Sequence, residues 1–139
     1  MRQTHDICTV EIHTPGLVEI TDRISRSVEN IGMSAGLVTI FCRHTSASLL
    51  IQENADPDVV RDLDAFFRRL VPEGDPLFVH TAEGPDDMPA HVKAALTQTS
   101  LTIPLLDGRL ALGRWQGIYL FEHRRRPHRR EIVISAIGE

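Results

Sequence analysis

Residues 100–137, SLTIPLLDGRLALGRWQGIYLFEHRRRPHRREIVISAI, decide the fold because they contain four β-strand patterns in succession. Apolar runs and alternation predict strands over residues 100–105, 109–112, 115–123 and 131–137. Asp107-Gly108 is typical of the tight turn of a β-hairpin, since both residue types tolerate positive φ. Strands joined by such short turns predict a largely antiparallel sheet.

Upstream of this segment, strand and helix patterns alternate. Strands are predicted over residues 4–13, 36–44, 47–52 and 77–80. A first helix is indicated by apolar residues three and four positions apart, with Gly32 at its end: Leu17, Ile20, Ile24, Val28 and Ile31. Asp56-Pro57 is a strong helix start, because the carboxylate can cap the helix and proline fits its first turn.

The second and third helices each have a predicted inward face. In the second helix it is formed by Val59, Val60, Leu63, Phe66, Phe67 and Leu70. In the third it is formed by Met88, His91, Val92, Ala95 and Leu96. These patterns together predict an α+β fold, a largely antiparallel β-sandwich with about three helices packed outside.

Composition bounds the class of protein. The 139 residues are expected to form a single domain, 1–139, with 42% hydrophobic residues. No apolar run is long enough to span a bilayer, and the N-terminal residues alternate rather than forming a signal peptide, so we expect a cytoplasmic protein without a membrane or nucleic-acid partner. Cys8 and Cys42 lie in strand patterns, which favours core thiols over a disulfide.

The net charge of −4 is unevenly distributed. Residues 53–91 carry ten acidic residues and three arginines, whereas residues 109–130 carry seven arginines and one acid, Glu122. One end of the protein could therefore meet a cation and the other an anion, with Arg129 and Arg130 as candidates for anion binding. The alternative is a solvated acidic helix face and a basic hairpin tip.

Three histidines are candidate metal ligands. His44 ends the strand 36–44 on its inward side, and His80 and His91 bracket the acidic loop EGPDD. Inward imidazoles on three separate elements suit zinc, and three protein ligands would leave one coordination position open. The alternative is that each histidine forms hydrogen bonds within the core. Four other histidines are expected at the surface: His5, His13, His123 and His128.

The residues around these histidines suggest further roles. Glu83 and Asp86 could orient a histidine or act as a general base, whereas Asp87 is interpreted as the helix cap before Pro89. A serine nucleophile after His44 is not favoured, because no Gly-x-Ser-x-Gly turn is present. Trp115 stands between Gly113 and Gly117, and we interpret it as a core residue rather than a ligand contact.

Four stretches in the same order resemble the YjbQ-like family, whose members are often labelled secondary thiamine-phosphate synthase enzymes. They are HTSASLLIQENADPDV, HTAEGPDDMPAHVKAAL, SLTIPLLDGRLALGRWQGIYL and RREIVISAIGE. The resemblance implies an antiparallel β-sandwich, a homotrimer and a site on His44, His80 and His91. It also draws attention to Glu53, Asn54, Asp56, Glu83, Trp115 and Gln116. The chain departs from the family at Arg114, where threonine is usual, and at Gln98, where glycine is frequent.

The activity that the resemblance implies is thiamine phosphate formation. Joining a pyrimidine diphosphate to a thiazole phosphate requires anion binding and a divalent metal, with zinc expected here and magnesium as the alternative. Trp115, Gln116, Arg129 and Arg130 are the candidates for contacting the small anionic ligand. The chain has no Gly-rich phosphate loop followed by Lys-Ser/Thr. The alternative function is a non-catalytic homotrimer that binds a metal or a metabolite.

Overall fold

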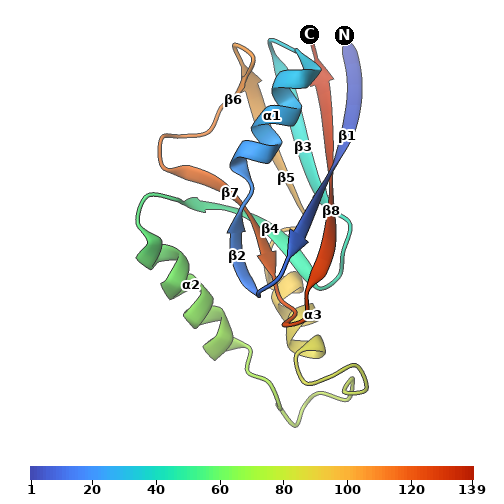
Figure 1. Cartoon of the computed structure of the whole chain (residues 1–139), viewed down its shortest axis with the longest axis vertical. Helices are drawn as coiled ribbons and strands as arrows, with labels where there is room; N and C mark the ends of the chain where they lie inside the picture. Colours follow the sequence, from blue (N-terminus) through green and yellow to red (C-terminus); the bar gives the residue numbers. More distant parts are fainter.

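Two antiparallel β-sheets form the body of the protein in a computed structural model that describes residues 1–139 (Figure 1). The five-stranded sheet has the order β1 (Arg2–Ile12), β8 (His128–Gly138), β3 (Gly36–Cys42), β5 (Ser100–Leu106) and β6 (Arg109–Leu110). The three-stranded sheet has the order β2 (Gly16–Glu19), β7 (Gln116–Glu122) and β4 (Ala47–Glu53). The predicted hairpin is confirmed, because Asp107 and Gly108 both have positive φ between β5 and β6.

The hydrophobic core lies where the strands turn their alternate residues inward. Val38, Ile40 and Cys42 of β3 are all buried, as the alternation along this strand predicts. Helix α1 (Thr21–Ile31) adds Ile24 and Val28 to the same cluster of 18 buried residues. With α2 (Pro57–Leu70) and α3 (Asp87–Leu96), the structure has three helices and two antiparallel sheets, which confirms the predicted α+β fold.

The predicted first and second helices need corrections. Leu17 lies in β2 instead of the helix, because β2 pairs with β7 and α1 begins only at Thr21. The start of α2 is confirmed, since the Asp56 side chain accepts a hydrogen bond from the backbone N–H of Asp58 at 2.9 Å. Its predicted inward face is confirmed only in part, because Phe66 and Leu70 are exposed whereas the other four residues of that face are half-buried. None of its residues is fully buried, but Phe67 packs edge-on against Phe121 of β7, with the ring centroids 5.3 Å apart.

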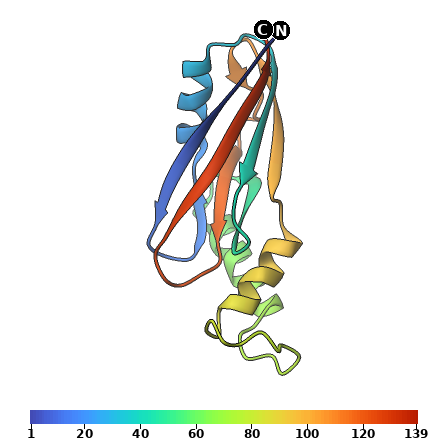
Figure 2. The ribbon, with the colours of Figure 1, turned by 90° about the vertical axis from the view of Figure 1, so that its right-hand side faces the viewer.

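The segment before α3 and the face of α3 also differ from the predictions. Residues 77–80 form no strand, and the chain from 71 to 86 connects α2 to α3 without a helix or strand. The buried residues of α3 are Asp87, Pro89 and Ala90, whereas Leu96 is exposed. Figure 2 shows α3 at the end of the molecule opposite the two chain termini. The three helices, of 10 to 14 residues, are too short to span a membrane.

Candidate metal centre

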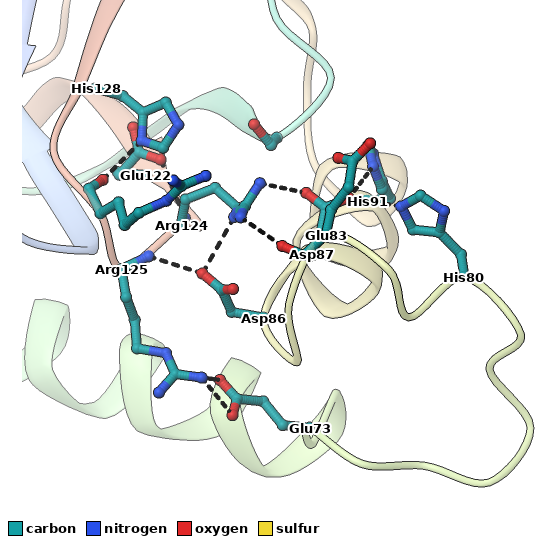
Figure 3. Close-up of polar contacts among 12 residues, drawn as sticks. Glu73, His80, Glu83, Asp86, Asp87, His91, Glu122, Arg124, Arg125 and His128 are labelled. Atoms are coloured by element: carbon teal, nitrogen blue, oxygen red, sulfur yellow. Dashed lines mark hydrogen bonds and ion pairs between the residues drawn. The ribbon is translucent and has the colours of Figure 1, made fainter.

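Asp87 is the centre of the candidate site. It is the first residue of α3, and its side chain is only 2% exposed. Its Oδ1 accepts a hydrogen bond from Arg124 Nη1 at 2.5 Å. Its Oδ2 lies 2.6 Å from His80 Nε2 and 3.1 Å from His91 Nε2 (Figure 3). One buried carboxylate therefore faces a guanidinium on one side and two imidazoles on the other.

The orientation of His91 follows from the spacing in α3 and from a backbone contact. Asp87 and His91 are four residues apart, which places both side chains on one face of the helix. His91 Nδ1 donates a hydrogen bond to the carbonyl oxygen of Thr45 at 3.0 Å. In a neutral ring this leaves an unprotonated Nε2 pointing at a carboxylate oxygen. That contact is favourable only with a second proton on the ring or with a cation between the two atoms.

Arg124 attaches the loop 71–86 to the end of β7. Its side chain is buried, and it donates to Asp86 Oδ2 at 3.1 Å and to the backbone carbonyl of Glu83 at 3.1 Å. The backbone N–H of Arg125 also donates to Asp86 Oδ2, and its guanidinium pairs with Glu73 at 2.7 Å. These contacts fix the loop that carries His80 next to α3 (Figure 3).

The electrostatics of Asp87 and Asp86 favour their charged forms. Burial alone would raise the pKa of Asp87, but the hydrogen bond from His80 and the charge of Arg124 outweigh it and hold this pKa below its usual range. Burial likewise opposes ionisation of Asp86, and bonds from the Arg125 backbone and the Arg124 guanidinium lower its pKa. Both carboxylates are therefore ionised at neutral pH.

A second buried ion pair lies next to this site. Arg130 binds both oxygens of Glu122, with Nε to Oε2 at 2.6 Å and Nη2 to Oε1 at 2.5 Å, and it also donates to Ser46 Oγ at 3.0 Å. The backbone N–H of Arg124 donates to the same Glu122 side chain. Arg130, predicted to bind an anion at a basic tip, is thus buried and paired within the protein, whereas Arg129 is exposed.

His44 lies outside the group formed by His80, Asp87 and His91. Its Nε2 accepts a hydrogen bond from the backbone N–H of Glu131 at 2.7 Å. Burial and the nearby Arg130 lower the pKa of His44, which favours the neutral ring that this bond requires. His123 was predicted at the surface and is instead buried, because it follows β7 into the core. Of the other three, His5 and His13 are exposed and His128 is partly buried.

Trp115 and Gln116 lie at the opposite end of β7 from Glu122, so the structure does not bring them to the histidines. The prediction that Trp115 is a core residue is wrong. Its side chain is exposed, and the Arg114 guanidinium stacks over its ring at 4.7 Å from the centroid. Gln116 accepts a hydrogen bond from the backbone N–H of Gly113. These residues shape a separate surface.

Asp87 is the ligand candidate that sequence reasoning missed. It was interpreted as the helix cap, but Asp86 occupies that position and neither aspartate forms a side-chain capping bond there. The Glu83 side chain is exposed, and the contact of this residue with Arg124 is made by its backbone oxygen. The spacing of Asp87 and His91 on one helical face was the signal that could have identified the pair.

The donor atoms of His80, Asp87 and His91 fit a divalent metal. One ligand atom from each lies within 4.8 Å of the others. Two imidazole nitrogens and one carboxylate oxygen suit zinc or a similar transition metal better than magnesium, which prefers oxygen ligands. The side chains of His80 and His91 are 42% and 34% exposed, so a bound ion would remain accessible from outside.

These features define the class of protein: an α+β fold with two antiparallel sheets and a His–Asp–His group next to α3. The chain belongs to the UPF0047 protein YjbQ-like family, whose pattern it matches over residues 6–139. It is 51% identical to UPF0047 protein sll1880 of Synechocystis over 99% of this chain and 94% of that one. It is 39% identical to UPF0047 protein YjbQ of Escherichia coli O157:H7 over 94% and 95% of the two chains.

Solved structures agree with this assignment. A YjbQ/UPF0047 protein of Clostridium acetobutylicum superposes with a TM-score of 0.81 at 36% identity, covering 94% of this chain and 99% of that chain. A YbjQ-like protein of Sulfolobus solfataricus gives a TM-score of 0.86 at 23% identity, covering 99% and 100%, and supports the fold alone. The family name states no substrate, so the chemistry has to be argued from the site.

Proposed function

We propose that this protein is a metal-dependent enzyme that acts on a small, anionic, phosphorylated or heterocyclic substrate, with thiamine phosphate formation as the named case. His80, Asp87 and His91 would hold the metal, and zinc suits them better than magnesium. The observation that carries the proposal is the contact between His91 and Asp87. His91 Nδ1 donates to Thr45, so its Nε2 faces Oδ2 of a buried carboxylate, where a cation would satisfy both atoms.

The surrounding residues support this role. Arg124 holds Oδ1 of Asp87, which leaves Oδ2 directed at the two imidazoles. Its further bonds to Asp86 and Glu83 hold the loop next to the metal ligands, so the three donor atoms are positioned before any ligand binds. A divalent ion at this place would supply Lewis-acid chemistry toward an oxygen of the substrate.

The same proposal includes assembly of the chain into a homotrimer in the cytoplasm. The outer face of the five-stranded sheet carries exposed apolar side chains that lie in register across neighbouring strands. Ile7, Leu37, Phe41 and Ile137 are each between 44% and 48% exposed. Helix α2 adds Phe66 and Leu70, which are 46% and 53% exposed. Contact with further copies would remove these surfaces from water.

The test combines metal content and activity. His80→Ala removes one of three ligands and is expected to abolish both zinc binding and thiamine phosphate formation while leaving the fold intact, since His80 is partly exposed. His13→Ala, at an exposed histidine without a side-chain bond, is the matched control and should change neither. Zinc content is measured by elemental analysis, and product formation from the pyrimidine diphosphate and thiazole phosphate by chromatography.

Two outcomes would contradict this proposal. Activity that survives both His80→Ala and chelation would show that the His–Asp–His group is not the catalyst. Zinc bound by the wild type without turnover would favour the second candidate, a non-catalytic homotrimer that binds a metal or metabolite. The exposed apolar surfaces are compatible with that candidate as well.

A further inference from the structure

A pocket of about 240 Å³ lies next to the candidate metal centre, between the loop 71–86 and the start of α3. Nine residues line it, and one of them is His80, so the pocket shares a wall with the His–Asp–His group. Figure 3 shows His80 projecting from the loop toward Asp87 and His91. A ligand in this pocket would therefore lie directly beside an ion held by these three residues.

The wall of the pocket is mostly apolar. Its two large apolar residues are Phe78 from the loop and Met88 from the first turn of α3, and Pro85 and Pro89 add rigid rings. Aromatic rings pair favourably with one another, and a thioether also makes favourable contacts with a ring. A wall of this kind favours a flat aromatic or heteroaromatic ring over a flexible polar chain.

Phe78 is held at the pocket by a local turn. The backbone N–H of Leu77 donates to Asp75 Oδ1 at 2.9 Å, and that of Phe78 donates to the carbonyl oxygen of Asp75 at 3.1 Å. Leu77 and Val79, on either side of Phe78, are 79% and 95% exposed, whereas Phe78 is half-buried. The loop therefore directs one of its three consecutive apolar residues to the pocket, and this wall is formed before any ligand binds.

The charges around the pocket exclude an anion. None of its nine lining residues is an arginine or a lysine, although the chain has fifteen of them. Asp75 is its only acidic residue, and Thr81 adds a hydroxyl group. A phosphate group placed here would meet a carboxylate and no cation. The pocket therefore suits the uncharged part of a substrate, with Thr81 available to a heteroatom of the ring.

We propose that this pocket binds the uncharged ring of the substrate, a single aromatic or heteroaromatic ring, while the phosphate group lies at the metal. The inference rests on the proposed function, because it assigns two parts of one substrate to neighbouring places. The pocket is smaller than the about 300–1,000 Å³ typical of sites for drug-sized ligands, which limits the occupant to one ring. Phe78 is the residue that selects for the ring.

The first experiment detects ring binding without a metal. The full chain is labelled with ¹³C at the methyl groups of its three methionines, Met1, Met33 and Met88, and stripped of metal with EDTA. It is then titrated with 4-fluorobenzyl alcohol, a neutral single ring, and the methyl signals are followed by NMR. The Met88 signal should shift and saturate, whereas those of Met33 in the core and of the exposed Met1 should not. Inorganic phosphate should leave the Met88 signal unchanged.

Two loop variants test the role of Phe78. Phe78→Ala should weaken the binding of 4-fluorobenzyl alcohol at least about fivefold, because it removes the aromatic wall. Leu77→Ala is the matched control, since it truncates the neighbouring apolar residue, which is 79% exposed and does not line the pocket. This variant should bind the ring like the wild type.

A second experiment connects the ring to the metal. In the zinc-loaded protein, phenyl phosphate should bind at least about fivefold more tightly than methyl phosphate, because only the former carries a ring. Phe78→Ala should remove this difference while leaving the affinity for methyl phosphate unchanged. Isothermal calorimetry measures both affinities.

The outcomes separate this inference from the proposed function. A saturable shift of Met88, weakened in Phe78→Ala and kept in Leu77→Ala, supports the ring pocket. No shift of Met88, an equal response to inorganic phosphate, unaltered affinity in Phe78→Ala, or equal affinity for phenyl and methyl phosphate overturns it. Failure to bind zinc would contradict the proposed function alone, because the NMR titration needs no metal. Zinc binding and turnover with an unresponsive Met88 would keep the metal centre and reject the pocket.

Discussion

Asp87 and Glu122 are both buried carboxylates held by arginines, yet their surroundings differ. Glu122 gives both oxygens to Arg130, and the exposed fractions of the two side chains are 0% and 4%. Asp87 gives one oxygen to Arg124 and the other to two imidazoles that reach the surface. The first pair is closed, in that both side chains are buried and paired with each other, and it stabilises the fold. The second is open on one side, which is what a ligand-binding group requires.

The largest effect expected from this comparison is on stability. Arg130→Met leaves the Glu122 carboxylate buried without its partner, and the free energy of unfolding should fall by about 3–5 kcal/mol. His80→Ala removes one partner of the buried Asp87 carboxylate, which keeps Arg124, and should cost only about 1–2 kcal/mol. Urea unfolding of both variants measures the difference. Similar losses in the two variants would show that the closed and open groups do not differ in role.

An effect of intermediate size is expected in the pH dependence of stability, through His123, which directly follows Glu122 in the sequence. Burial, with the charges of Lys93 and Arg130, lowers the pKa of His123 from 6.5 to about 3. The unfolded chain therefore binds a proton at His123 between these pH values while the folded chain does not. Stability contributed by the neutral ring is lost as pH falls through this window, at about 1.4 kcal/mol per pH unit.

His123→Phe tests this prediction, because it removes the titrating ring from the same position. The free energy of unfolding is measured by urea at intervals from pH 7 to about pH 4, within the range where the chain stays folded. The wild type should lose more stability over this range than the variant. Parallel curves for the two proteins would show that His123 is not held neutral by its burial.

Much of the fold could be predicted from local signals. The Asp107-Gly108 turn, the Asp56-Pro57 helix start and the alternation in β3 each depend on a few neighbouring residues, and the structure confirms them. The face of α2 was predicted only in part, because Phe67 packs on Phe121 as expected whereas Phe66 and Leu70 remain exposed in the single chain. Leu17 was misplaced since its spacing from Ile20 also fits a helix, and only pairing with β7 decides for a strand.

The candidate site was predictable in part. His80 and His91 bracket one loop, so their proximity follows from the chain itself. Asp87 was missed because a carboxylate at a helix start is normally a cap, and only the distant Arg124 directs it elsewhere. The position of Arg130 in the core depends on Glu122, eight residues earlier across the turn from β7 to β8, and that of His123 depends on Ser48, 75 residues away. Neither pair leaves a periodic pattern in the sequence.

The smallest expected effect concerns His44, which belongs neither to the His–Asp–His group nor to the Glu122–Arg130 pair. His44→Ala removes the acceptor for the backbone N–H of Glu131 and should lower the free energy of unfolding by about 1 kcal/mol. Zinc affinity should stay within about twofold of the wild type, because His44 does not belong to the His–Asp–His group. Calorimetric zinc titration of folded His44→Ala measures this. A loss of zinc as large as in His80→Ala would restore His44 as a ligand.

The placement of the ligands on α3 and on the loop before it has a kinetic consequence. Asp87 and His91 occupy successive turns of one helix, so two donors are fixed as soon as that helix forms. His80 lies on the loop 71–86, which Arg124 and Arg125 attach to the end of β7. With the loop held in this way, all three donors would already be in place for an incoming ion. Its residence time would be set by how often those arginines release the loop, rather than by how fast the ion arrives.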